Sequence, residues 1–237
     1  MHPAQVERES IINDFQKKIK VKFKSLELLH QVFVHRSYLN ENPGFPLNHN
    51  ERLEFLGDAV LELVVTEYLY ATYPNPEGDL TNWRSALVKG QMLASVAQEL
   101  EIGDLLYLSK GEEKSGGKSR ALILANTFEA LIGAIYLDLG YKESQKFITH
   151  NLLGRLPEIL EKGWHVDSKS RLQELSQDQL GITPNYRVLS ERGPDHAKEF
   201  TVGVFLAEKH IGQGAGNSKQ AAEQAAASSA LQNWKHV

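Results

Sequence analysis

The stretch Asn50–Leu61, which reads NERLEFLGDAVL, is the most informative part of this chain. In a helix, Glu51, Glu54 and Asp58 are spaced at i, i+3 and i+7 and therefore share one face. Three carboxylates on one face repel one another unless a cation is bound, although a solvated helix face is the common explanation of such spacing. Gly57 costs roughly 0.5–1 kcal/mol relative to alanine inside a helix, which favours close packing or ligand access at this position.

A second polar pair interrupts an apolar helix further along the chain. In the stretch Leu122–Leu131, Asn126 and Glu129 lie at i and i+3 among apolar residues. An acid in such a helix is rarely buried without a partner, and clustered oxygen ligands without His or Cys suit a hard cation such as Mg²⁺. A salt-bridged Glu129 and a capping or surface Asn126 are open alternatives. Spacing alone cannot place the two helices side by side.

The hydrophobic pattern divides the chain into two parts. The part that ends at Lys162 predicts only helices and shows no strand-like alternation. The second part predicts the order α-β-β-β-α, so the fold class is a multidomain one: an all-α domain over 1–162 and a small α+β domain over 168–237, joined by a short polar linker. In the first part we expect helices over Val6–Lys20, Leu26–Tyr38, His49–Tyr73, Leu80–Val88, Gln91–Glu101, Arg120–Leu139 and Lys142–Lys162, and a Gly-rich charged loop over Lys110–Arg120. In the second part we expect helices over Ser168–Leu180 and Ser218–Trp234, and strands over Tyr186–Glu191, Glu199–Glu208 and within Lys209–Gly216.

Composition excludes several classes of site. The chain has 237 residues, 41% of them hydrophobic and 24% charged, and no cysteine. Disulfides, thiolate metal sites and cysteine nucleophiles are therefore excluded. The charged start has no apolar signal region, and the stretch Ala121–Leu139 is expected to be too polar to span a bilayer, so we expect a cytoplasmic protein with no membrane partner. The net charge is −4, so the placement of charge, not its total, must identify a ligand.

The stretch Asn50–Leu61 closely resembles the signature of bacterial ribonuclease III. Four further segments resemble family segments in the same order, and the match covers roughly residues 10–237; these segments are His35–Tyr38, Glu77–Leu80, Lys110–Gly117 and Ile123–Asp138. The resemblance implies an all-helical endonuclease domain that forms a homodimer. It also implies cleavage of double-stranded RNA that depends on Mg²⁺, for which Mn²⁺ could substitute, and that leaves 5′-phosphate and 3′-hydroxyl ends.

The resemblance also implies roles for individual residues. Glu54 and Glu129 would be metal ligands, and Asp58 would contact the metal and help to position the attacking water. Glu51 would be a supporting catalytic acid near the RNA backbone, and Glu129 would belong to the catalytic group as well. Glu77 is a weaker candidate because its segment is expected to lie in a connection, and an acid at the start of a helix is the alternative. The same likeness places Phe55 near a dimer contact, with core packing as the alternative.

One position departs from the family pattern. The family typically has aspartate where this chain has Asn126, which would be a metal ligand by the same likeness. An amide keeps one carbonyl oxygen but loses the charge and the second acceptor. Three interpretations are open: a natural variant that still binds Mg²⁺, an engineered change that blocks cleavage, or a weakened nuclease.

The C-terminal α-β-β-β-α order resembles a double-stranded RNA-binding domain. Such domains read the shape, phosphates and 2′-hydroxyls of A-form RNA, whose bases are hidden in a deep groove. In this chain the resemblance implies contacts to RNA by Gln173, Glu174, His196, Ser218 and Lys219. A second lysine is common where Gln220 stands, so we expect a shallower salt dependence than in a more basic member.

Two functions compete on this sequence. The first is a ribonuclease III-type endonuclease that processes ribosomal RNA precursors and other structured RNAs, including messenger RNAs. The second is a protein that binds double-stranded RNA but cuts it poorly because of Asn126. A ribosome-associated structural protein is a third possibility, against which stand the retained Glu51, Glu54, Asp58 and Glu129.

Overall fold

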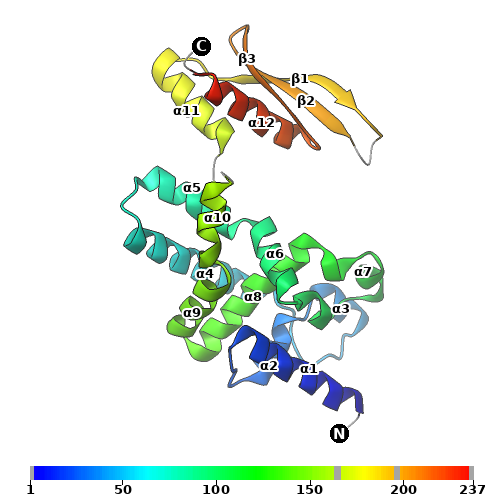
Figure 1. Cartoon of the computed structure of the whole chain (residues 1–237). Coiled ribbons are helices and arrows are strands. Elements are labelled where there is room, and N and C mark those ends of the chain that lie inside the picture. The colour runs from blue at the N-terminus through cyan, green and yellow to red at the C-terminus, as the bar shows by residue number, and fades with distance from the viewer. Residues whose placement is uncertain (1–2, 163–166, 195–197, 235–237) are drawn as a thin grey trace. The chain divides into compact units, whose positions relative to one another are not determined.

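The computed structural model of the chain describes residues 3–162, 167–194 and 198–234. The chain divides into two compact units, Met1–His165 and Val166–Val237, and each is described by itself (Figure 1).

The first unit is helical and is built around α8 (Ala121–Leu139), which packs against α4 (Glu51–Thr72), α6 (Gly90–Glu99) and α9 (Tyr141–Asn151) (Figure 1). The remaining helices are α1 (Pro3–Ile19), α2 (Leu26–Val32), α3 (Arg36–Glu41), α5 (Glu77–Val88), α7 (Lys110–Lys114) and α10 (Leu156–Glu161), with short 3-10 turns η1 (Ile102–Leu105), η2 (Gly117–Ser119) and η3 (Leu153–Arg155).

Helix α8 is apolar because it is the core of this unit. Phe128, Leu131, Ile132 and Ile135 are fully buried along it. The expectation that this stretch is too polar to span a bilayer is wrong, because α8 is long enough and apolar enough to do so. Its most apolar window is nevertheless 61% buried inside the protein. Burial in the core accounts for this composition, so it is weak evidence of a membrane span.

Helices α4 and α8 touch through their backbones at two glycines. A Cβ atom added to Gly57 would lie 1.8 Å from the carbonyl oxygen of Glu129, and one added to Gly133 would lie 2.2 Å from that of Leu53. No larger residue fits at either position unless the helices separate. The expectation of close packing at Gly57 is confirmed, and Gly133 supplies the matching surface on α8.

Two of the predicted long helices are broken. The one expected over Leu26–Tyr38 ends at Val32, because Val34 forms a parallel bridge with Tyr107 and the His35 side chain then caps a new helix, α3. The one expected over Lys142–Lys162 is divided into α9, η3 and α10. Periodicity alone missed both breaks since the apolar spacing continues across them.

The expected loop over Lys110–Arg120 is also partly wrong. Lys110–Lys114 forms the short helix α7, whose N-cap Ser109 accepts a hydrogen bond from the backbone N–H of Glu112. Gly116, at a φ of 82°, separates this helix from the turn η2. The Ser-x-x-Glu pattern is a helix-start signal that the glycine content of the segment obscured.

The second unit has the predicted α-β-β-β-α order. It consists of α11 (Ser168–Leu180), β1 (Asn185–Arg192), β2 (Glu199–Leu206), β3 (Lys209–Gly216) and α12 (Lys219–Gln232), with an antiparallel sheet of strand order β1-β2-β3 (Figure 1). Val202, Val204 and Leu206 of β2 are buried, as their alternation predicts, and the alanine-rich α12 packs closely on β3.

Candidate active site and RNA interface

The close crossing of α4 and α8 brings the predicted acids of the two helices together. Glu54 and Asp58 flank Gly57 on α4, and the backbone carbonyl of Glu129 lies against Gly57 from α8. Asp58 is exposed, whereas Glu54, Asn126 and Glu129 are half-buried. These four residues are called the acidic cluster below. The sequence predicted the members of each helix, and the structure joins them.

Electrostatics confirm that the carboxylates act on one another. Burial, followed by the negative charges of Asp58 and Glu54, raises the pKa of Glu129 to about 7 from its ordinary 4.5. Each of the three causes disfavours the ionised form of Glu129. Among the residues that the structure describes, no basic side chain pairs with Glu54, Asp58 or Glu129, so the cluster has the uncompensated charge expected at a cation site.

Glu54 interacts with both helices. Its pKa is raised chiefly by burial, then by the charge of Glu51, while a hydrogen bond from the side-chain amide of Asn126 acts in the opposite direction. Asn126 thus donates a hydrogen bond to the Glu54 carboxylate, although the family pattern has an acid at position 126. An aspartate at this position would replace that donor with a fourth negative charge.

Glu51 lies at the edge of the cluster beside Arg36 and His49. Its carboxylate lies 3.2 Å from the guanidinium of Arg36 and 3.8 Å from Nδ1 of His49. Glu77, by contrast, is exposed in the first turn of α5, where it accepts a hydrogen bond from the Thr81 hydroxyl. Its segment is a helix start, not a connection, and nothing in the described contacts joins it to the cluster.

The donor set fits a hard divalent cation. Carboxylate oxygens from two helices and one amide oxygen are the ligand types that Mg²⁺ prefers, and Mg²⁺ keeps several waters when it binds a few carboxylates. Among the described residues, no three Asp, Glu or His side chains already converge closely enough to hold an ion. Three mutually repelling carboxylates have no reason to converge without a cation between them.

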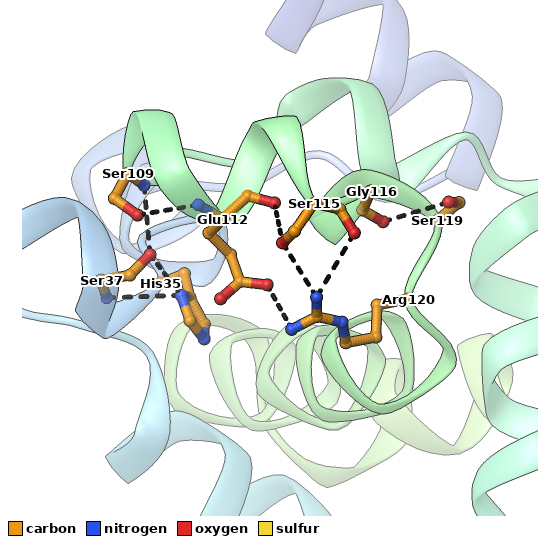
Figure 2. A network of polar contacts seen from close by, with 8 residues as sticks. All are labelled: His35, Ser37, Ser109, Glu112, Ser115, Gly116, Ser119 and Arg120. Carbon is orange, nitrogen blue, oxygen red and sulfur yellow. Dashed lines mark hydrogen bonds and ion pairs between the residues drawn. The ribbon is translucent and has the colours of Figure 1, made fainter.

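A polar network that the sequence did not reveal fixes the start of α8. Figure 2 shows the Arg120 guanidinium between the Glu112 carboxylate and Ser115. The Ser37 hydroxyl lies 2.8 Å from Nδ1 of His35 and accepts a hydrogen bond from the backbone N–H of Ser109. The family resemblance pointed to these segments, but the sequence alone could not predict the network. Some of its hydrogen bonds join segments that lie far apart in the sequence, such as Ser37 and Ser109.

The predicted RNA contacts of the second unit lie on its surface where they are described. Gln173 and Glu174 are exposed on α11, and Lys219 is exposed at the start of α12. The Ser218 hydroxyl caps α12 by accepting a hydrogen bond from the backbone N–H of Ala221. His196 lies outside the described residues.

Comparisons with known proteins match both units. A family model described as ribonuclease-III-like matches residues 25–156, and one described as the double-stranded RNA binding motif matches residues 168–234. The chain belongs to the ribonuclease III family. Ribonuclease 3 of Bacillus velezensis is 47% identical over 221 residues, covering 92% of this chain and 88% of the relative. Ribonuclease 3 of Pelotomaculum thermopropionicum is 48% identical over 205 residues, covering 86% of this chain and 85% of the relative.

A solved structure supports the same assignment for the helical unit. The nuclease domain of ribonuclease III from Campylobacter jejuni is 39% identical, with a TM-score of 0.54, covering 59% of this chain and 97% of that chain. The description of that structure refers to a region involved in dimer formation.

This member of the family exposes a large aromatic residue next to its acidic cluster. Phe55 lies between Glu54 and Gly57 in the sequence and is 82% exposed. It borders a groove of about 660 Å³ whose apolar lining includes Leu28, Leu56 and Leu137. The core-packing alternative for Phe55 is therefore wrong, and an apolar surface of this kind favours a protein partner.

Proposed function

We propose that this ribonuclease III-family chain is a Mg²⁺-dependent endoribonuclease that hydrolyses double-stranded RNA at the acidic cluster, leaving 5′-phosphate and 3′-hydroxyl ends. The observation that carries the proposal is the uncompensated negative charge where α4 and α8 cross, expressed in the Glu129 pKa of about 7. A site of this charge repels RNA unless it binds a cation, which ties cleavage to a divalent metal.

The residues of the cluster have separate roles in this proposal. Glu54, Asp58 and Glu129 would hold the metal through carboxylate oxygens, and Asn126 would add its amide oxygen after turning away from Glu54. When bound, Mg²⁺ shields the phosphate charge and lowers the pKa of water. Asp58, the exposed member, would help to position the attacking water. Glu51, at the edge of the site, would be a supporting acid near the RNA backbone.

The two units would divide the work. We infer that the nuclease domain spans residues 1–162 and that the RNA-binding domain spans 168–237. The second domain would hold the duplex through Gln173, Glu174, His196, Ser218 and Lys219. Burial of Phe55 in the apolar groove of a second copy would form a homodimer, which brings two acidic clusters into one particle.

The cellular role follows from the substrate class. Duplex segments occur in ribosomal RNA precursors and in structured messenger RNAs, and we propose that the enzyme processes these RNAs in the cytoplasm. Mn²⁺ would support the reaction in place of Mg²⁺, because both accept oxygen ligands.

A cleavage assay on a long RNA duplex, with and without Mg²⁺, tests the proposal. The chain as written should cut only with Mg²⁺, Glu129→Gln should not cut, and Asn126→Asp should cut at a lower Mg²⁺ concentration. Glu161→Gln is a matched control because Glu161 is an exposed carboxyl outside the cluster. Binding without cleavage in the chain as written, with cleavage restored by Asn126→Asp, would instead support the binding-only function.

A further inference from the structure

A row of lysines follows α1 in a unit that is otherwise acidic. Residues 17–24 hold five lysines and no acid, whereas residues 1–165 hold 18 basic and 22 acidic side chains. Lys20, Lys22 and Lys24, called the lysine strip below, are all exposed. Within the part of the chain that the structure describes, no carboxylate forms an ion pair with any of the three.

The fold holds the lysine strip in a fixed register. Val21 and Phe23 alternate with the lysines and are buried in the core at 6% and 5% exposure. The backbone N–H of Phe23 donates to the Gln16 side chain at 2.9 Å, and that of Lys24 donates to Asp138 at 2.6 Å. With Val21 and Phe23 buried, Lys20, Lys22 and Lys24 are exposed on the outer side of one short anchored segment.

Helix stability explains only some of these lysines. Lys17 and Lys18 lie in the last turn of α1, where basic residues favour the helix dipole, and they pair with Asp14 and Glu101. Lys20 has a φ of 57°, in the left-handed region where glycine is the favoured residue after a helix. Lysine is thus present there against the conformational preference. Lys22 and Lys24 lie beyond the helix and have no such structural reason.

The lysine strip is close to the acidic cluster. Asp138, which binds the backbone of Lys24, and Glu129 belong to the same helix, nine residues apart. Nine residues of helix correspond to about 14 Å. Beside the strip lies a groove of about 460 Å³ lined by Asn13, Gln16, Lys17, Lys20, Val21 and Lys22. The side chains that border it supply ammonium and amide donors, which suit phosphate oxygens.

We propose that the lysine strip is a second RNA-binding surface, on the nuclease unit itself, that contacts the phosphate backbone of the duplex away from the cleaved bond. This proposal rests on the proposed cleavage at the acidic cluster, because the strip would contact a duplex that is held for cutting there. Its role is to offset the repulsion between RNA and an acidic unit. Contacts of this kind position the substrate and carry no sequence preference.

The salt dependence of RNA binding tests the proposal. The full chain and its Lys20→Gln/Lys22→Gln/Lys24→Gln variant are titrated with a long RNA duplex in EDTA, which stops cleavage, between about 50 and 200 mM salt. Three lost phosphate contacts lower the salt slope by about 2.7. The Kd of the unmodified chain should therefore rise about 40-fold more over this range than that of the variant. In Mg²⁺, the variant should show a higher KM with kcat unchanged.

The matched control is Lys89→Gln/Lys114→Gln/Lys142→Gln, which removes the same charge from exposed lysines elsewhere in the unit. Equal slopes in the two triple variants would overturn the proposal, since only net charge would then matter. Lys20→Gly guards against misfolding: it should raise the melting temperature and still lower the slope by about one. An unchanged RNA slope with lost binding to anionic lipid vesicles would assign the strip to a membrane surface instead.

Failure of the proposed function gives a different result. If the chain does not cleave RNA at all, the salt slope in EDTA still reports whether the lysine strip binds the duplex. If Glu129→Gln abolishes cleavage with an unchanged salt slope, the two sites are separate, as the proposal requires.

Discussion

Replacing Gly57 with alanine tests whether the backbone contact between α4 and α8 builds the active site. The added Cβ would lie 1.8 Å from the Glu129 carbonyl oxygen and 2.8 Å from the Gly133 nitrogen, whereas real Cβ atoms essentially never approach closer than 3.0 Å. Because both neighbours are backbone atoms, no side chain can rotate away. The helices must therefore separate at their crossing until the contact of 1.8 Å has opened to at least 3.0 Å.

Two consequences follow from a separation of this size. Overpacking of a core costs roughly 1–3 kcal/mol, and we expect Gly57→Ala to lie near the upper end, at about 3 kcal/mol of unfolding free energy. The displacement also moves Glu54 and Asp58 away from Glu129. A misplacement of about 1 Å costs on the order of 100-fold in rate, so kcat should fall by about that factor.

Urea unfolding, monitored by circular dichroism, measures the unfolding free energy. Single-turnover cleavage of a long duplex measures the rate. Gly90→Ala is the control, since a Cβ at Gly90, the first residue of α6, meets nothing within 4 Å. It should change neither quantity appreciably. RNA affinity measured in EDTA should be little altered in Gly57→Ala. A Gly57→Ala protein with unchanged stability and rate would refute the argument that this contact positions the acids.

Further predictions concern charge, assembly and RNA contact. Without divalent metal, Glu129→Gln should raise the unfolding free energy at pH 8 by about 2 kcal/mol, after allowance for partial exposure, and hardly at all at pH 4. The sign follows because a folded-state pKa of about 7 against 4.5 makes stability fall as pH rises between these values, and equal effects at both pH values would contradict it. Phe55→Asp should convert the homodimer to monomers in analytical ultracentrifugation, whereas Leu180→Asp, an exposed apolar position of the second unit, should not; a dimeric Phe55→Asp protein would exclude this surface. Ser218→Ala should destabilise the second unit by about 1 kcal/mol, measured by thermal unfolding, through loss of the N-cap of α12. Lys219→Gln should cost at most about 1 kcal/mol of that stability, through loss of its exposed ion pair with Glu191. It should also lower the salt slope of RNA binding by about one, and an unchanged slope would remove Lys219 from the interface.

The sequence predicted the composition of the site better than its assembly. Helical spacing placed Glu51, Glu54 and Asp58 on one face, and it also paired Asn126 with Glu129. It could not join α4 to α8, because that contact depends on two glycines on separate helices, of which only Gly57 drew notice. The family resemblance predicted that the acids of the two helices form one site. The raised pKa of Glu129 agrees, because the charges of Asp58 and Glu54 on the other helix contribute to it.

The errors in the helical pattern have two different physical causes. The predicted helix after Leu26 ends early because Val34 pairs with Tyr107, a residue far along the chain. The short helix α7 went unpredicted because three glycines outweighed the capping signal at Ser109. A tertiary contact overrides local propensity at Val34, whereas at α7 a local cap was overlooked. The α-β-β-β-α order of the second unit has no comparable conflict, since alternation, turns and caps there agree.

Direct measurement of metal binding and cleavage on the same samples tests the central claim, that a divalent cation bound by the acidic cluster performs the reaction. Bound Mn²⁺ is counted by electron paramagnetic resonance, without RNA, for the chain as written, Glu54→Gln, Glu129→Gln and the control Glu161→Gln. Each sample is then assayed for cleavage in Mn²⁺. Loss of bound Mn²⁺ together with cleavage in the two cluster variants, with both retained in the control, is the predicted result. Full Mn²⁺ binding in both cluster variants, or cleavage that persists without it, would contradict the account.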